Sequence, residues 1–306
     1  MSNSENQKEI AVPQGDSEIQ LPLQIFTPPN EGELITSSTT NNTYRIGKPI
    51  GSGNFGIVYE CSDTWENSLA VKVLKPKGTY ELVKQSAIAE FQKLMLLWHP
   101  HVTYIYDAFE YRHTFYIVVE RCATPINDLI KMKDFNGNVW LRPIARCLLQ
   151  AVHFIHVNNL VHQDIHGGNV FTSWIHDEMI PEKVSAISFK LGDLGISKFV
   201  SEMDATTTIL AEWMRAPESL NLQEFGPMDH RMDIYHCGLL LLQVLLGRPL
   251  TFSRDEVLAG APRQQALQLG GAYSFAIEKA LRRHVDFRTA SAMELWRDLN
   301  TPVAGA

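Results

Sequence analysis

The sequence predicts an α+β fold of two unequal parts, a small β-rich lobe followed by a larger, mainly helical lobe. Short runs of β-branched and aromatic residues, separated by turn residues, occupy residues 44–119. After residue 122 the apolar residues recur instead with the spacing of long amphipathic helices. A polar stretch, residues 1–43, precedes both lobes. We therefore expect a tail at 1–43, a small lobe at 44–121 and a large lobe at 122–306.

Each lobe has identifiable elements. The small lobe is expected to hold five strands and one helix, because β-prone runs stand at 44–51, 56–62, 68–74, 102–109 and 114–119, and a 3.6-residue period covers 80–98. The large lobe is expected to contain four main helices, at 140–158, 232–246, 273–283 and 290–299. No internal repeat is apparent in the sequence.

The tail differs from the rest in composition and charge. It is rich in Ser, Thr, Asn, Gln, Pro and Glu, and one lysine against six carboxylates gives it a net charge of −5. Such a segment buries too little apolar area to offset its conformational entropy, so we predict disorder over 1–43. The alternation of Ile19, Leu21, Leu23 and Ile25 would also allow a short docking strand.

Bulk composition excludes several classes of protein. Hydrophobic residues make up 45% of the chain and charged residues 20%, as in ordinary globular proteins. With the tail removed, the net charge of −7 falls to about −2, which gives no broad basic surface for nucleic acid. The longest apolar run, 237–247, is about half of what a bilayer requires, so we expect a buried core helix and no membrane span. The N-terminus shows no secretory signal. Four cysteines without paired spacing favour a reducing, cytoplasmic location.

A glycine-rich string joins the first two expected strands. It reads Gly51-Ser52-Gly53-Asn54-Phe55-Gly56, and Val58 follows closely. Glycine lacks a Cβ and reaches positive φ, so such a loop lets the backbone approach phosphates closely. In a dinucleotide-binding unit a helix would follow, whereas here a strand follows. The string predicts a phosphate site of another type, although a glycine-rich hairpin without a ligand would look the same.

Charged and amide residues that could perform chemistry follow in a fixed order. Lys72 lies in the apolar strand Leu69-Ala70-Val71-Lys72-Val73-Leu74. Glu90 lies on the helix expected at 80–98, with Glu81 as the second candidate for the same position. A catalytic-loop candidate reads His162-Gln163-Asp164-Ile165-His166-Gly167-Gly168-Asn169, and Gly192-Asp193-Leu194-Gly195 comes after an apolar strand. Any one of these residues alone could be an ordinary surface residue.

Together with Ala216-Pro217-Glu218, these strings resemble in order and spacing the motifs of the eukaryotic-type protein kinase family. The resemblance runs from Tyr44 to Leu299. It implies a two-lobed protein-kinase-like fold that transfers the γ-phosphoryl group of ATP to a protein hydroxyl, of Ser or Thr, including the enzyme's own. ATP and Mg²⁺ are the implied cofactors, and a protein substrate is the implied partner.

The resemblance also implies a role for each matched residue. Asp164 would orient the attacking hydroxyl, and Lys72 would bind the α- and β-phosphates and pair with Glu90. His166 stands where Ser/Thr kinases place a lysine beside the γ-phosphate. Asn169 and Asp193 would hold Mg²⁺. The nucleotide-binding set would be Gly51, Ser52, Gly53, Asn54, Phe55, Gly56, Val58, Ala70, Lys72, Val119, Glu120 and Cys122, with adenine on the backbone of the last two.

Framework residues agree with the resemblance. Glu218 would pair with Arg288 and so fasten the end of the activation segment to the large lobe. Asp233 would accept backbone hydrogen bonds from the catalytic loop. Both could instead be ordinary surface ion-pairing groups, a reading that their positions in the motifs disfavour.

Several positions depart from the family pattern. Gln163 replaces the arginine that receives an activation-segment phosphate, so that switch should be weakened. Ala211 replaces a threonine, Leu194 replaces a phenylalanine, and an insertion at about 174–186 predicts a lengthened hairpin. The string at 164–169 also looks like the loop of small-molecule kinases related to aminoglycoside phosphotransferases. A nucleotide-binding pseudokinase scaffold is a third possibility, although the expected catalytic residues are all in place.

Overall fold

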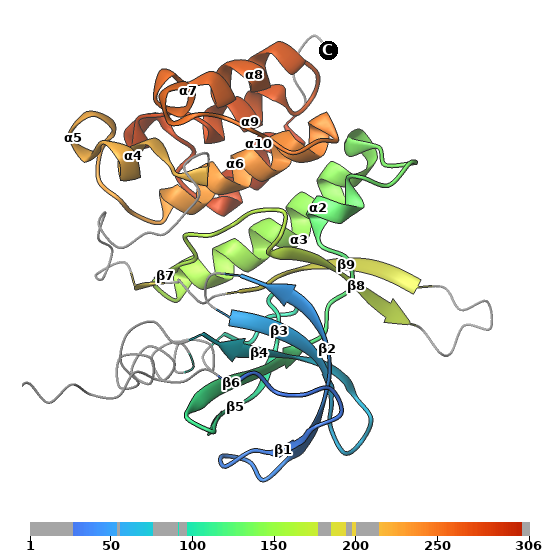
Figure 1. Cartoon of the computed structure of the whole chain (residues 1–306). Coiled ribbons are helices and arrows are strands. Elements are labelled where there is room, and N and C mark those ends of the chain that lie inside the picture. The colour runs from blue at the N-terminus through green and yellow to red at the C-terminus, as the bar shows by residue number, and fades with distance from the viewer. Residues whose placement is uncertain are drawn as a thin grey trace, which may run out of the picture.

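The computed structural model of the chain has two lobes, with an antiparallel sheet below and a helical assembly above in Figure 1. The structure describes residues 27–53, 56–75, 91, 97–176, 185–193, 198–199 and 214–301. Six strands form the sheet of the small lobe, in the order β1-β2-β3-β4-β6-β5. The predicted α+β class and the order of the two lobes are confirmed.

The sheet is built from β1 (Leu34–Thr36), β2 (Thr43–Ser52), β3 (Gly56–Ser62), β4 (Ser68–Leu74), β5 (Ile105–Tyr111) and β6 (Thr114–Glu120). The predicted limits of β3 and β4 are confirmed. The predicted start of the fourth strand at residue 102 is wrong. The N–H of Thr103 donates to Leu191 O over 2.9 Å, so this segment joins the large lobe before β5 begins.

The first strand corrects the predicted tail. Residues 34–36 were expected to be disordered, but they form β1 and pair with β2 in the register Ile35↔Tyr44. Ile35 is fully buried in the apolar cluster of the sheet, and this burial stabilises the short strand. The sheet therefore has six strands rather than five. Residues 1–26, with the apolar alternation at 19–25, lie outside the described residues, as does almost all of the helix predicted at 80–98.

The large lobe is mainly helical (Figure 1). Its elements are α2 (Ile126–Leu129), α3 (Gly137–Val157), α4 (Pro217–Leu220), α5 (Leu222–Phe225), α6 (Arg231–Leu246), α7 (Arg254–Ala259), α8 (Ala261–Leu269), α9 (Ser274–Ala280), η3 (Val285–Phe287) and α10 (Ala292–Asn300). The four predicted helices correspond to α3, α6, α9 and α10, and the other helices were not predicted. Helix α6 is the buried core helix expected around 237–247. Within the described parts of the chain, no helix has the length and apolarity to cross a bilayer.

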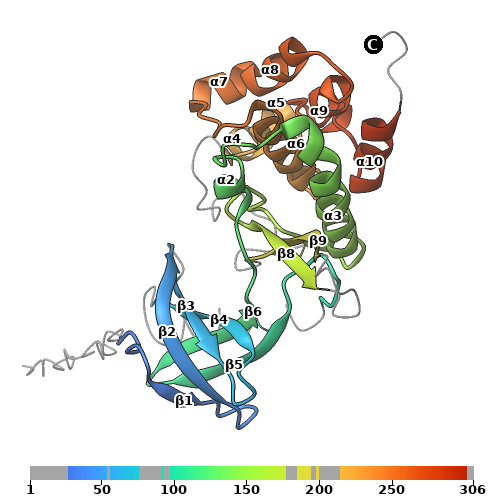
Figure 2. The same cartoon turned by 90° about the vertical axis from the view of Figure 1, so that its right-hand side faces the viewer.

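A two-stranded hairpin separates the sheet from the helices (Figure 2). Strands β8 (Val170–His176) and β9 (Ser185–Leu191) pair along their whole length, which fits the predicted lengthened hairpin. A second short pair joins β7 (Leu160–Val161) to β10 (Lys198–Phe199). Because β8 begins directly after Asn169 and β9 ends shortly before Asp193, the hairpin brings the two ends of the expected chemistry together.

Candidate active site

An ion pair joins the small lobe to Asp193, two residues after the end of β9. Lys72 Nζ lies 2.6 Å from Asp193 Oδ1. Lys72 occupies the middle of β4 between Val58 and Ile117 on the neighbouring strands, and its side chain is 12% exposed. The structure thus brings the strand lysine and the predicted metal ligand together. Glu90, expected to pair with Lys72, lies outside the described residues, as does Glu81.

The catalytic-loop candidate is closed by Asn169. Its Nδ2 donates to Asp164 O over 2.9 Å and to Asp164 Oδ2 over 3.0 Å. The carboxamide nitrogen is therefore committed to Asp164, and any ligand of Asn169 must use Oδ1. This arrangement fixes the rotamer of the Asp164 carboxylate, which is the group expected to orient a hydroxyl.

His166 sits beside the same carboxylate. Its Nε2 lies 3.6 Å from Asp164 Oδ1, and its Nδ1 accepts the N–H of Gly168 over 3.0 Å. In the neutral ring the proton is therefore on Nε2, the nitrogen that faces Asp164. A Cβ at position 168 would lie under 3.0 Å from the ring, so glycine there makes room for His166. These two contacts hold the ring beside the Asp164 carboxylate.

A buried carboxylate anchors the start of this loop. Asp233 of α6 accepts the N–H of His162 and the N–H of Gln163, each over 2.8 Å, and its third partner is His156 Nε2 at 2.8 Å. Burial alone would raise the pKa of Asp233, but the hydrogen bond from His156 and the nearby imidazoles hold that pKa below its ordinary value. The expectation that Asp233 supports the catalytic loop is confirmed.

His162 connects the two segments that carry the candidate residues. Its Nδ1 accepts the N–H of Asp164 over 3.2 Å, so Nε2 carries the proton and donates to Gly192 O over 3.1 Å. The imidazole is fully buried. It thereby ties the backbone at Asp164 to the backbone just before Asp193.

Gln163 is packed inside the lobe. It has a positive φ of 69°, is 1% exposed, and its Nε2 lacks a hydrogen-bond partner among the described residues. The ring nitrogens of His236, on α6, are likewise without such a partner in that part of the chain, and burial lowers the pKa of His236. Ala211 and Leu194 lie outside the described residues.

The glycine-rich string forms the turn between β2 and β3. The N–H of Gly53 donates to Gly56 O over 2.9 Å. Lys75, which the sequence did not single out, donates from Nζ to Ser52 Oγ at 3.2 Å and to Gly53 O at 3.0 Å. A Cβ at Gly56 would lie under 3.0 Å from Val73 O, which explains that glycine by close backbone approach. Asn54 and Phe55 lie outside the described residues.

The residues expected around adenine lie on neighbouring strands. Ala70 of β4 pairs with Val119 of β6. The N–H of Glu120 donates to Tyr104 O over 2.8 Å, so a ligand at this residue would have to use its carbonyl. The Glu120 carboxylate is held by Lys190 Nζ at 2.6 Å. Burial, assisted by Glu120, raises the pKa of the Cys122 thiol to about 12, which keeps it protonated.

The donor set suits a hard cation. Asn169 Oδ1 and the Asp193 carboxylate offer oxygen atoms, the ligand type that Mg²⁺ prefers, and Mg²⁺ usually takes one or two protein oxygens plus phosphates and water. Across the described ranges, no group of three or more His, Cys, Asp or Glu side chains is arranged to hold a metal. The site therefore fits a magnesium ion brought with a phosphate ligand better than a closed structural metal site.

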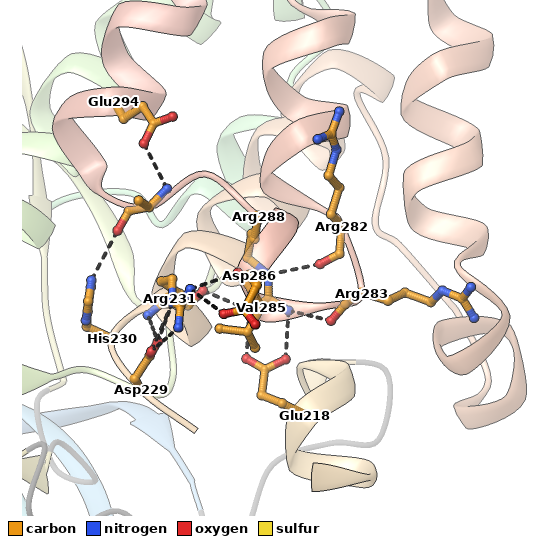
Figure 3. A network of polar contacts seen from close by, with 11 residues as sticks. Glu218, Asp229, His230, Arg231, Arg282, Arg283, Val285, Asp286, Arg288 and Glu294 are labelled. Atoms are coloured by element: carbon orange, nitrogen blue, oxygen red, sulfur yellow. Dashed lines mark hydrogen bonds and ion pairs between the residues drawn. The ribbon is translucent and has the colours of Figure 1, made fainter. Parts of the chain in front are cut away.

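A buried ion pair fastens Glu218 to Arg288, as predicted. Arg288 Nη1 and Nη2 donate to Glu218 Oε1 and Oε2 over 2.7 Å each, and both side chains are fully buried (Figure 3). The guanidinium also donates to the carbonyls of Arg231, Arg282 and Arg283. The Arg288 guanidinium thus donates hydrogen bonds from all three of its nitrogens, and these bonds offset the desolvation free energy of burying its charge.

Breaking this pair should destabilise the large lobe strongly. We expect Glu218→Ala to lower the free energy of unfolding by about 3–5 kcal/mol, because Arg288 would stay buried without its counter-charge. Urea denaturation followed by circular dichroism measures it. Asp286→Ala is the control: its carboxylate, 81% exposed, meets Arg231 at 3.3 Å, and its loss should cost no more than about 1 kcal/mol. Equal effects of the two substitutions would contradict the structural role of Glu218.

The family described as protein kinase domain matches residues 44–288. Human cyclin-dependent kinase-like 4 is 28% identical over 211 residues, which is 68% of this chain and 52% of that protein. Serine/threonine-protein kinase TAO2 of Rattus norvegicus is 25% identical over 234 residues, 76% of this chain and 18% of that protein. Serine/threonine-protein kinase PLK2 of Mus musculus is 26% identical over 226 residues, 72% of this chain and 31% of that protein. The matched region thus spans about half the length of these relatives or less.

Proposed function

The chain belongs to the protein kinase domain family, and from this premise we propose that it transfers the γ-phosphoryl group of Mg-ATP to Ser or Thr hydroxyls of a protein substrate, its own included. The family implies the use of ATP and Mg²⁺. Two of the relatives named above, TAO2 and PLK2, are named serine/threonine-protein kinases, which supports the same acceptor here.

The observation that carries the proposal is the Lys72–Asp193 ion pair at 2.6 Å, formed between the sheet and the end of the β8–β9 hairpin. Phosphoryl transfer depends mainly on positioning and on charge near the phosphates. Lys72 would supply the cation, the glycine-rich turn would cover the phosphates, and Asp193 with Asn169 Oδ1 would hold the metal ion. These roles are proposals for the residues whose geometry is described above.

Asp164 would act on the acceptor. Its carboxylate is oriented by Asn169 Nδ2 and lies beside His166. A carboxylate held in this way can accept a hydrogen bond from the attacking hydroxyl and take its proton. His166, with its Nε2 toward Asp164, would stand in the place where the family resemblance implies a lysine ammonium.

A protein acceptor is favoured over a small molecule by the Glu218–Arg288 pair and the Asp233 anchor, which form the large-lobe framework expected of protein kinases. The scaffold alternative is disfavoured because the candidate catalytic residues are held in place: Lys72 pairs with Asp193, and Asn169 donates to Asp164. The four cysteines form no disulfide, in keeping with a cytosolic location, which we also propose.

A direct assay tests the acceptor class. Purified chain, Mg²⁺ and γ-labelled ATP are incubated in parallel with a generic Ser/Thr-containing protein and with aminoglycosides. We expect label on the protein, and on the chain itself, at phosphoserine or phosphothreonine. Label confined to the small molecule would establish the other kinase class, and no transfer to any acceptor would favour the scaffold.

A further inference from the structure

We propose that Asn127 and Gln243 form a polar clamp that positions the catalytic loop by holding Gly167, and that Gln243 is therefore a positioning residue for phosphoryl transfer. The inference rests on the proposed function, because it assigns residues to the support of the same loop. Neither residue belongs to the predicted site, and they stand far apart in the sequence, on α2 and α6.

The clamp contacts the loop at two points. The backbone N–H of Asn127 donates to Gly167 O over 2.8 Å. The side-chain oxygen of Asn127 lies against the same glycine and accepts a hydrogen bond from Gln243 Nε2 over 2.7 Å. In the sequence, Gly167 directly follows His166 and stands between Asp164 and Asn169. The clamp therefore acts on the part of the loop that orients both candidate catalytic groups.

Helix α2 is fixed in place by the hairpin that carries the loop. The N–H of Ala123 donates to Thr172 O over 2.9 Å, and the N–H of Thr172 donates to Thr124 O over 2.8 Å. In both views α2 lies at a height between α6 above it and β8 below it (Figures 1 and 2). A side chain on α2 that also bonds to α6 thus links the loop to the most buried helix of the large lobe.

Stability alone does not account for Gln243. It is 3% exposed on a helix whose surrounding positions are almost all apolar and buried. A carboxamide in such a position gains little net free energy from its hydrogen bond, whereas an apolar side chain of similar volume can be neutral or stabilising there. The arrangement is explained if the bond serves to hold Asn127 in one rotamer against the loop.

Glycine at position 167 is required by the same contact. A Cβ there would lie under 3.0 Å from Asn127 Oδ1 and 3.2 Å from Gln243 Nε2. The Asn127 side chain cannot rotate away from this position without losing its hydrogen bond from Gln243. The clamp therefore requires glycine at position 167, because the loop backbone there lies directly against the side-chain amide of Asn127.

The test is a kinetic double-mutant cycle on the full chain. We expect Gln243→Leu to lower kcat about tenfold with KM for ATP unchanged, because a small misplacement of the loop penalises transfer but not nucleotide binding. Asn127→Ala should lower kcat by a similar factor, and the double variant should fall no further. Gln150→Leu is the matched control, since Gln150 is exposed on α3 and donates only to Arg146 O of its own helix; its kcat should be unchanged.

A second arm uses the space beside Gly167. Gly167→Ala should lower kcat, and Asn127→Ala combined with Gly167→Ala should be no slower than Asn127→Ala alone, because the obstructing oxygen is gone. Thermal unfolding of every variant separates loss of kcat from loss of folded protein.

Two results would overturn the clamp: additive losses in the Gln243→Leu and Asn127→Ala cycle, or an unchanged kcat in folded Gln243→Leu. Failure of the proposed function would be a different outcome. In that case Asp164→Ala would keep its transfer activity, regardless of the kcat measured for Gln243→Leu.

Discussion

Asp164→Ala is expected to lower kcat by about 10³-fold while the affinity for Mg-ATP changes little. A positioned general base typically contributes 10²–10⁴ to the rate, and the Asp164 carboxylate is fixed for such a role by Asn169 Nδ2 at 3.0 Å. The substitution removes the group proposed to meet the acceptor hydroxyl but leaves Lys72 and Asp193 in place. Steady-state transfer to protein, together with calorimetric titration of Mg-ATP, measures the two quantities separately.

Two further variants make the result interpretable. Asp164→Asn keeps the shape of the side chain but not its charge or basicity, so it should be nearly as slow as alanine. Asp255→Ala removes an exposed carboxylate from the first turn of α7 and should leave kcat unchanged. A turnover in Asp164→Ala close to that of the unmodified chain would show that another group accepts the proton.

Local sequence patterns were sufficient to predict those helices and strands that are defined by a motif or by a strong hydrophobic period. The limits of β3 and β4 follow from β-prone runs bounded by Gly56, Ser62 and Asn67, and the apolar character of 237–247 follows from the burial of α6 on all sides. The partners of Glu218 and Asp233 were also predictable, because each lies in a motif of the resembling family and the structure confirms the contacts.

Short elements were missed because their stability comes from partners elsewhere in the chain. Strand β1 has three residues, and only the burial of Ile35 against Tyr44 distinguishes it from its polar surroundings. Helix α7 does carry a local signal that could have identified it: Ser253 and Glu256 form a capping box, with Ser253 N–H donating to Glu256 Oε2 over 2.7 Å.

The contacts that hold the candidate site residues in place were the hardest to predict from the sequence. Lys75 reaches Ser52 across a hairpin, and Gln243 reaches Asn127 from another helix. Such contacts leave no periodicity or spacing in the sequence, since any polar residue at those positions would look like an ordinary surface or cap residue. The burial of Gln163 shows the same limit, because it depends on how the loop packs against the rest of the large lobe and not on a local pattern in the sequence.

Lys72→Met is expected to lower kcat/KM by about 100-fold or more without unfolding the small lobe. Lys72 supplies a cation 2.6 Å from Asp193 Oδ1, at the position proposed to meet the phosphates. Removing one charged or hydrogen-bonding group aimed at the transferred phosphoryl typically costs 10²–10³ in rate. The stem of Lys72 packs in an apolar strand, and methionine preserves that packing, so the melting temperature should change little.

Charge and shape at this position can be separated by comparison with two other lysine variants. Lys72→Arg keeps the charge but places it in a larger planar group, so it should recover only part of the loss. Lys133→Met removes an exposed lysine of the large lobe and should leave kcat/KM unchanged. If folded Lys72→Met transferred phosphate as fast as the unmodified chain, the Lys72–Asp193 pair would be a structural link between the lobes, and the phosphate-binding cation would have to be sought on another element.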